Sequence, residues 1–102
     1  LERAQQLANR FVFIGTSTSF YFYLDKSSIS LLNNAYQFKM FLTERSTGDY
    51  YNNLTVYMTN DALFCSPEKG KICASKKDYK KIPPGSIYAN AYKYLQTGGV
   101  YD

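Results

Sequence analysis

The sequence predicts a single α+β domain, an antiparallel meander of five or six strands with a C-terminal helix packed on it. Three observations support this fold. Aromatic residues make up 18% of the 102 residues, and such rings are enriched in short strands. Residues 35–42 alternate between apolar and polar side chains, which is typical of a half-buried strand. Residues 87–95 instead repeat their apolar side chains with the 3.6-residue period of a helix.

The first half of the chain contains most of the predicted sheet. Residues 1–10 are helix formers and predict a short N-terminal helix or a tether, so the domain itself spans residues 11–102. Residues 11–14 form one strand. Residues 20–24 form a second strand, which carries large side chains on both faces and is therefore expected inside the sheet.

A turn-forming segment interrupts this second strand before residues 29–32 resume it. We expect the Asp25 side chain to accept a hydrogen bond from the backbone two or three residues further on, as in an Asx turn. An Asn33-Asn34 turn then leads into the alternating strand of residues 35–42. The side chains predicted to face the core from that strand are Tyr36, Phe38, Met40 and Leu42.

The second half completes the sheet and adds the helix. Residues 54–58 form a further strand, and residues 62–65 pair with it before the chain continues through residues 72–79. Ser86 is a suitable N-cap, because its hydroxyl can accept a hydrogen bond from an amide of the first helical turn. Gly98-Gly99 is expected to end the helix.

Two cysteines flank a short turn, in which Pro67 and Gly70 suit a hairpin. If facing residues on this hairpin have numbers that sum to 138, Cys65 and Cys73 lie opposite each other. We therefore expect a disulfide that closes about nine residues, and an extracytoplasmic location where such bonds persist. The alternative is a pair of reduced, buried cysteines.

The positive charge is concentrated in one segment. The net charge is +4, yet residues 1–68 carry −1 and residues 69–81 carry +5. Such a patch is expected to attract a protein partner, an acidic polysaccharide or a membrane surface. It is not expected to bind nucleic acid, because it holds no arginine. The alternative is a solvated edge strand whose lysines prevent sheets from pairing edge to edge. The candidate binding residues are Lys69, Lys71, Lys76, Lys77, Lys80 and Lys81.

The sequence contains no histidine, which excludes Ser-His-Asp and Cys-His catalysis and His-ligated zinc. The acidic residues that remain for catalysis are in predicted turns, and nothing in their spacing brings two of them together. They are Asp25, Glu44, Asp49 and Asp61. We therefore predict no catalytic residue, no metal site and no cofactor. No apolar run has the length needed to span a bilayer.

Two segments resemble a known family. Residues 22–29 (FYLDKSSI) are similar to an aromatic-aromatic-aliphatic-Asp-x-x-Ser-Ile segment of the surface-adhesin protein E family of Gram-negative bacteria. Residues 82–91 (IPPGSIYANA) resemble that family's approach to its C-terminal helix. The resemblance covers roughly residues 11–97. It departs from the family at Leu95, which stands where a cysteine commonly ties the helix to the middle of the sheet.

The resemblance implies a secreted or outer-membrane-anchored adhesin that contacts host matrix or plasma proteins. Together with the charge pattern, it predicts a non-enzymatic binding module that uses its basic edge and exposed tyrosines. We expect a monomer or a weak homodimer, since an unpaired edge strand permits pairing while its charge opposes it. The alternative function is a periplasmic inhibitor or envelope-assembly partner that acts through the loop of residues 66–72.

Overall fold

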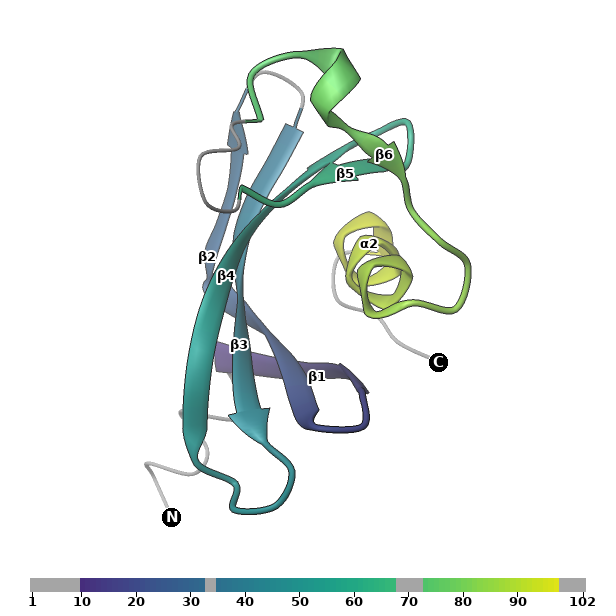
Figure 1. Cartoon of the computed structure of the whole chain (residues 1–102). Helices are drawn as coiled ribbons and strands as arrows, with labels where there is room; N and C mark the ends of the chain where they lie inside the picture. The colour runs from purple at the N-terminus through teal and green to yellow at the C-terminus, as the bar shows by residue number, and fades with distance from the viewer. Residues whose placement is uncertain (1–9, 33–34, 68–72, 98–102) are drawn as a thin grey trace.

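The computed structural model describes residues 10–32, 35–67 and 73–97. Six antiparallel strands form one sheet in sequence order, and a helix packs on it (Figure 1). This confirms the predicted α+β meander. The elements are β1 (Phe11–Thr16), β2 (Phe20–Leu32), β3 (Ala35–Glu44), β4 (Tyr50–Thr59), β5 (Leu63–Cys65), the 3-10 helix η1 (Lys76–Asp78), β6 (Lys80–Lys81) and α2 (Ile87–Thr97).

Several predictions concern segments outside the described residues. They are the N-terminal helix or tether, apart from Arg10, and the turn at residues 33–34. The glycines expected to end the helix at residues 98–99 and the hairpin turn at residues 68–72 also lie outside.

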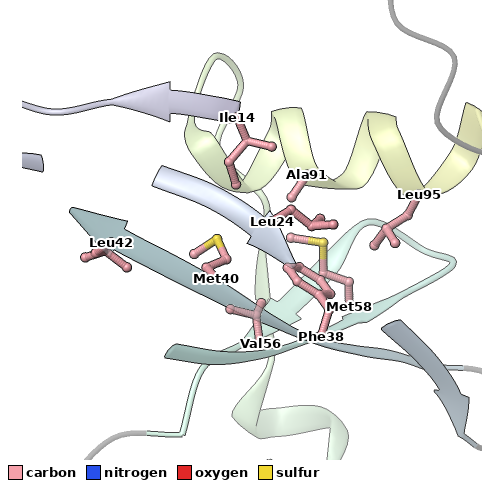
Figure 2. Close-up of a cluster of buried hydrophobic side chains, with 9 residues drawn as sticks. All are labelled: Ile14, Leu24, Phe38, Met40, Leu42, Val56, Met58, Ala91 and Leu95. Atoms are coloured by element: carbon pink, nitrogen blue, oxygen red, sulfur yellow. The ribbon is translucent and has the colours of Figure 1, made fainter. Parts of the chain in front are cut away.

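The hydrophobic core lies between the sheet and α2. Leu24 on β2 pairs with Met40 on β3, and both side chains are fully buried on the face that α2 covers. Phe38, Met40 and Leu42 of β3 point into this core and Tyr36 packs against it, as the alternation predicted. Burial of each large side chain stabilises the fold by roughly 1.5–3 kcal/mol. Figure 2 shows the core residues Ile14, Leu24, Phe38, Met40, Leu42, Val56, Met58, Ala91 and Leu95.

Helix α2 begins where the sequence predicts, because the Ser86 hydroxyl accepts a hydrogen bond from the Ala89 amide at 3.2 Å. Its buried residues are Ala91 and Leu95. Leu95 thus fills an apolar core position. The Tyr88 ring stacks on Phe64 of β5, with ring centroids 4.3 Å apart. In Figure 1 the helix lies between β1 and the β5–β6 pair.

The helix also protects the edge of β1. The Asn90 side-chain amide donates a hydrogen bond of 2.7 Å to the Ile14 carbonyl. The next residue, Gly15, lies so close to the helix that a Cβ there would be 2.7 Å from Cγ2 of Ile87. The contact between helix and strand therefore requires glycine at this position.

The predicted interruption of the second strand is a large β-bulge. Asp25 pairs with Lys39 and Ser30 pairs with Gln37, so residues 26–29 lie opposite a single residue of β3. Strand β2 nevertheless continues to Leu32. The Asx turn is confirmed, since the Ser27 amide donates to the Asp25 carboxylate at 3.0 Å.

Side-chain hydrogen bonds hold this bulge against β3. The Ser28 hydroxyl donates to the Asp25 carbonyl and accepts from the Lys39 amide, at 2.7 and 2.8 Å. A hydroxyl therefore replaces a backbone carbonyl in the ladder. The pairing of β2 with β3 is interrupted at the bulge and resumes at Ser30 with a shifted register.

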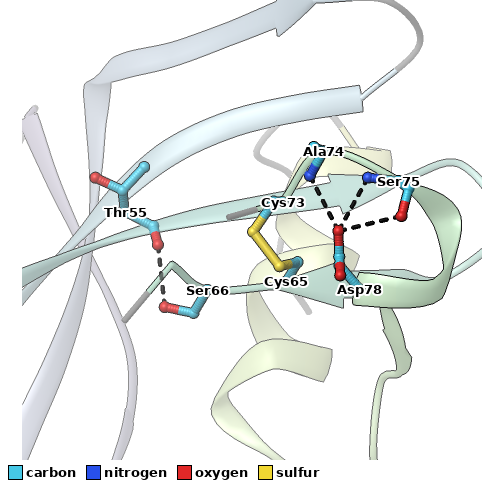
Figure 3. The surroundings of a disulfide bond; sticks show 7 residues. All are labelled: Thr55, Cys65, Ser66, Cys73, Ala74, Ser75 and Asp78. Carbon is cyan, nitrogen blue, oxygen red and sulfur yellow. Dashed lines mark hydrogen bonds between the residues drawn. A yellow bond between two sulfur atoms is a disulfide. The ribbon is translucent and has the colours of Figure 1, made fainter. Parts of the chain in front are cut away.

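The Cys65–Cys73 disulfide is confirmed, with the two Cα atoms 5.9 Å apart (Figure 3). The predicted hairpin register is wrong, however. Strand β5 pairs with β6 at Leu63 and Lys81, so facing numbers sum to 144 rather than 138. Cys73 precedes η1 and does not face Cys65 across a ladder.

The expected strand at residues 72–79 is also wrong over its described part, because η1 occupies residues 76–78. The Asp78 carboxylate accepts hydrogen bonds from the amides of Ala74 and Ser75 and from the Ser75 hydroxyl, at 3.0–3.2 Å. These local bonds compete with strand pairing, as short polar side chains often do. The basic segment consequently joins the sheet only at its end.

Candidate binding surface

The sheet face opposite α2, called here the outer face, carries a continuous group of aromatic rings. On β1, β2 and β3 these rings occupy the positions between the core residues, because successive side chains point to opposite faces. Neighbouring ring centroids in the group lie 4.9–6.5 Å apart. We call this group the aromatic row. Its members are Phe11, Phe13, Tyr21, Tyr23, Phe41 and Tyr50.

The aromatic row is accessible to a partner. Phe13 is 53% exposed and Tyr50 is 55% exposed, while the other four rings are partly buried against one another. Tyr51, the next residue after Tyr50, points to the opposite face of the sheet, where its ring centroid lies 4.5 Å from that of Phe20. Contiguous exposed apolar area of this kind marks interaction sites more often than isolated exposed rings do.

Cationic side chains border the aromatic row at both ends. The Arg10 guanidinium lies over the Phe11 ring at 5.0 Å, and the Arg45 guanidinium lies over the Tyr21 ring at 5.6 Å. Arg45 is also held by a hydrogen bond of 2.9 Å that it donates to the Ser17 carbonyl. Both arginines are therefore fixed over rings of the row by cation–π contacts.

A pocket of about 400 Å³ opens on the outer face beside the bulge of β2. Its walls include Phe11 and Phe41 of the aromatic row, together with Lys39 and Asn53. Arg10, Asp25, Met40 and the two serines of the bulge also line it. The pocket thus joins charged and hydroxyl groups to the apolar row, which is the composition of many ligand sites.

Asp25 is the buried charge of this pocket and is only 7% exposed. It accepts hydrogen bonds from Nε and Nη2 of Arg10, both at 3.1 Å, and from the amide and hydroxyl of Ser27. Burial raises the pKa of Asp25, but the bonds from Arg10 and Ser27 outweigh it and hold that pKa below its usual value. The same pair raises the pKa of Arg10.

The basic edge, defined as Lys76, Lys77, Lys80 and Lys81, lies at the other end of the sheet (Figure 1). All four side chains are exposed. Lys80 and Lys81 form β6, an edge strand, which fits the alternative that these lysines prevent edge-to-edge pairing. Lys69 and Lys71 lie outside the described residues.

One tyrosine beside this edge has a perturbed pKa. Burial raises the pKa of Tyr79, and the neighbouring Tyr57 and Asp78 raise it further.

The acidic residues considered for catalysis either accept hydrogen bonds that hold the fold or lie in turns. Asp25 is bound by Arg10 and Ser27. Glu44 accepts a hydrogen bond from the Thr47 hydroxyl in the β3–β4 turn that Asp49 also closes, and Asp61 lies in the β4–β5 turn. Within the described ranges no three His, Cys, Asp or Glu side chains are grouped to hold a metal. No helix in that part of the chain is both long and apolar enough to cross a membrane.

The sequence prediction named exposed tyrosines as contact groups but did not identify the aromatic row. The available signal was the presence of rings at positions 21, 23 and 41, between core residues of the same strands. Rings on both faces predicted only an inner strand. That no described element covers this face depends on where α2 packs.

Comparison with known proteins does not extend this picture: no family model matches the chain, and no curated protein and no solved structure matches it. The resemblance of residues 22–29 and 82–91 to the protein E family stays a prediction from the sequence.

Proposed function

We propose that this protein is a non-enzymatic, extracytoplasmic binding module, an adhesin that contacts host or matrix glycoproteins. Its contact surface is the aromatic row, and its basic edge contributes long-range attraction. The observation that carries this proposal is the row of six rings on the outer face, which no element of the described residues covers. The resemblance in sequence to surface adhesins points to the same class of function.

The row has the properties of a preorganised contact surface. Each ring packs against at least one neighbouring ring, which already restricts its rotation. Little side-chain entropy is therefore lost when a partner binds. Tyrosine and phenylalanine supply large contact areas, and aromatic residues are enriched at protein interfaces. The Cys65–Cys73 disulfide supports a location outside the reducing cytoplasm.

The two edges of the sheet support the expected monomer or weak homodimer. Edge strand β6 is only two residues long, and both are lysines. On the opposite edge, the Asn90 side-chain amide donates a hydrogen bond to the Ile14 carbonyl of β1. Both features disfavour pairing with a second sheet.

The alternative function, an inhibitor or envelope-assembly partner, places the contact on the loop of residues 66–72. Of that loop only Ser66 and Pro67 are described, and the Ser66 hydroxyl is bound to the Thr55 carbonyl at 3.1 Å (Figure 3). The aromatic row lies elsewhere on the sheet and therefore favours the first function.

Two neighbouring tyrosines provide a matched test. Tyr50 is 55% exposed and belongs to the row, whereas Tyr51 is 53% exposed and points to the other face. Binding of the purified, oxidised protein would be measured against a panel of matrix and plasma glycoproteins. We expect Tyr50→Ala to weaken saturable binding by about 1–2 kcal/mol, the loss typical of an interface anchor, and Tyr51→Ala to leave it unchanged.

The basic edge is tested by replacing its four lysines with glutamine. We expect a lower association rate at low salt and a smaller effect near physiological salt, because steering by exposed charges is screened.

Equal losses in Tyr50→Ala and Tyr51→Ala would refute the aromatic row as the contact surface. Absence of saturable binding to every glycoprotein would refute the adhesin function.

A further inference from the structure

We infer that the pocket beside the bulge of β2 is a binding site for an acidic polysaccharide. It receives one carboxylate or sulfate group between Arg10 and Lys39, while adjoining sugar rings lie on the aromatic row. This inference rests on the proposed function and names the recognised part of the glycoprotein partner as its acidic glycan.

Arg10 is held ready to bind an anion. It uses Nε and Nη2 for Asp25, which leaves the Nη1 edge of its five-donor guanidinium for another acceptor. Its side chain is 54% exposed, and it is fixed over the Phe11 ring. The guanidinium therefore presents a fork of donors in one orientation, the arrangement that binds carboxylate and sulfate groups in two-bond fashion.

Asp25 does not cancel this preference for anions. Its carboxylate accepts four hydrogen bonds and is nearly buried, so its charge is compensated within the fold. Among the described residues that line the pocket it is the only carboxylate, against two cations. Asp25 is thus a positioning residue for Arg10, and the pocket keeps an excess of positive charge.

Lys39 supplies the second cation from the neighbouring strand. It pairs with Asp25 across β2 and β3, its side chain is exposed, and it lines the same pocket. Its backbone amide, rather than its ammonium group, is the part bound by Ser28. The bond to Ser28 therefore leaves the ammonium group available, and Lys39 lines the same pocket as Arg10.

The pocket and the aromatic row are continuous, since Phe11 and Phe41 belong to both. One face of a pyranose ring is lined by C–H groups and packs on an aromatic ring, while its rim carries hydroxyl groups. The Asn53 amide and the Ser27 hydroxyl lie beside the rings and can bond that rim. The volume of about 400 Å³ is within the ligand-site range and admits a single acidic sugar.

Charge spacing favours a glycan over other polyanions. Three cations border the surface, namely Arg10, Lys39 and Arg45. A nucleic acid carries a charge on every nucleotide and is bound mainly by dense groups of lysine and arginine. An acidic peptide offers flat apolar faces only where it carries aromatic or proline side chains, whereas each sugar ring of a polysaccharide can offer one. An acidic polysaccharide combines separated anionic groups with such faces.

The test measures equilibrium binding of the full, oxidised chain to heparin and hyaluronan, with dextran as the uncharged polysaccharide. Lys39→Gln is compared with Lys93→Gln, the same substitution on an exposed lysine of α2, on the other side of the sheet. We expect Lys39→Gln to weaken heparin binding about tenfold, the loss of one charge-assisted contact. Lys93→Gln is expected to leave binding unchanged, and dextran is expected not to bind.

Arg10→Lys tests geometry rather than charge, because lysine keeps the charge but loses the fork. We expect weaker binding of heparin with an unchanged circular dichroism spectrum.

Equal losses in Lys39→Gln and Lys93→Gln would overturn the site. Single-stranded DNA that competes as well as heparin would overturn the assignment to a glycan, as would dextran that binds equally well.

The glycoprotein panel separates this inference from the proposed function. Enzymatic removal of acidic glycans from a bound glycoprotein is expected to abolish its binding. Binding that persists after this treatment would overturn the glycan site and leave the adhesin function standing. If no glycoprotein binds while heparin binds through Lys39, the adhesin function fails and the glycan site stands.

Discussion

Replacement of Asp25 with alanine is expected to destabilise the fold, although Asp25 lies in the candidate binding pocket. Its carboxylate holds the Ser27 amide at the start of the bulge and also pairs with Arg10. The hydrogen bond from the Ser27 amide is part-buried, whereas the Arg10 side chain is 54% exposed. The structure therefore predicts which of them contributes more to the free energy of unfolding.

The contact with Ser27 dominates. Removal of the carboxylate leaves the Ser27 amide without its acceptor in a part-buried position, which costs about 1–2 kcal/mol, and the hydroxyl bond adds a smaller loss. The Arg10 side chain is half exposed, so water screens its ion pair with Asp25 and the pair contributes little. We expect a total loss of about 2 kcal/mol, or roughly 10–15 °C in Tm for a domain of this size.

Urea denaturation followed by far-ultraviolet circular dichroism measures this loss. Two control variants separate the contribution of the Ser27 hydrogen bonds from that of the Arg10 ion pair. Asp25→Asn keeps an oxygen that can accept from Ser27, so most of the stability should be retained. Arg10→Met removes only the ion pair and should cost a small fraction of the loss in Asp25→Ala. An Arg10→Met loss as large as that of Asp25→Ala would refute this reasoning, and so would an unchanged stability of Asp25→Ala.

The same contacts predict a pH dependence. The pKa of Asp25 is lower in the folded protein than its ordinary value of 3.8, so the folded state favours the ionised carboxylate. Its contribution is therefore fully present well above pH 3.8 and is lost as the pH falls through the lower, folded pKa. The difference in unfolding free energy between the native protein and Asp25→Ala should be constant from pH 5 to 7 and narrow in acid. A difference that widens in acid would contradict the direction of this shift.

Two further expectations concern the packing of α2 and the disulfide. Gly15→Ala should cost about 2–3 kcal/mol, because its φ of +156° is strained for alanine and its Cβ would lie 2.7 Å from Ile87. Gly48→Ala has a φ of +76° but open space around it, so it should cost only about 1 kcal/mol; equal losses would show that the contact with the helix is unimportant. Replacement of Cys65 and Cys73 by alanine should lower the unfolding free energy by about 2.5 kcal/mol, as expected for a short closed loop. An unchanged urea midpoint in the double variant would contradict it.

Several features were determined by the sequence itself, because each depends on residues close together in the chain. The alternation in residues 35–42 assigns the core face of β3, since the strand period is two residues. Ser86 begins the helix through a bond to an amide three residues away. Asp25 forms its turn with Ser27, two residues away, and the two cysteines are separated by only eight positions.

Only the tertiary structure decided the register of β6 and the composition of the candidate site. The register depends on a competition between strand pairing and the hydrogen bonds of Asp78, and no periodic pattern records its outcome. The aromatic row joins rings from β1, β2, β3 and β4, and its pocket adds Arg10, which directly precedes β1, to Lys39 from β3. Within the described residues, which face is left open depends on the packing of α2 against the other face (Figure 1), because one helix can cover only one side of a sheet.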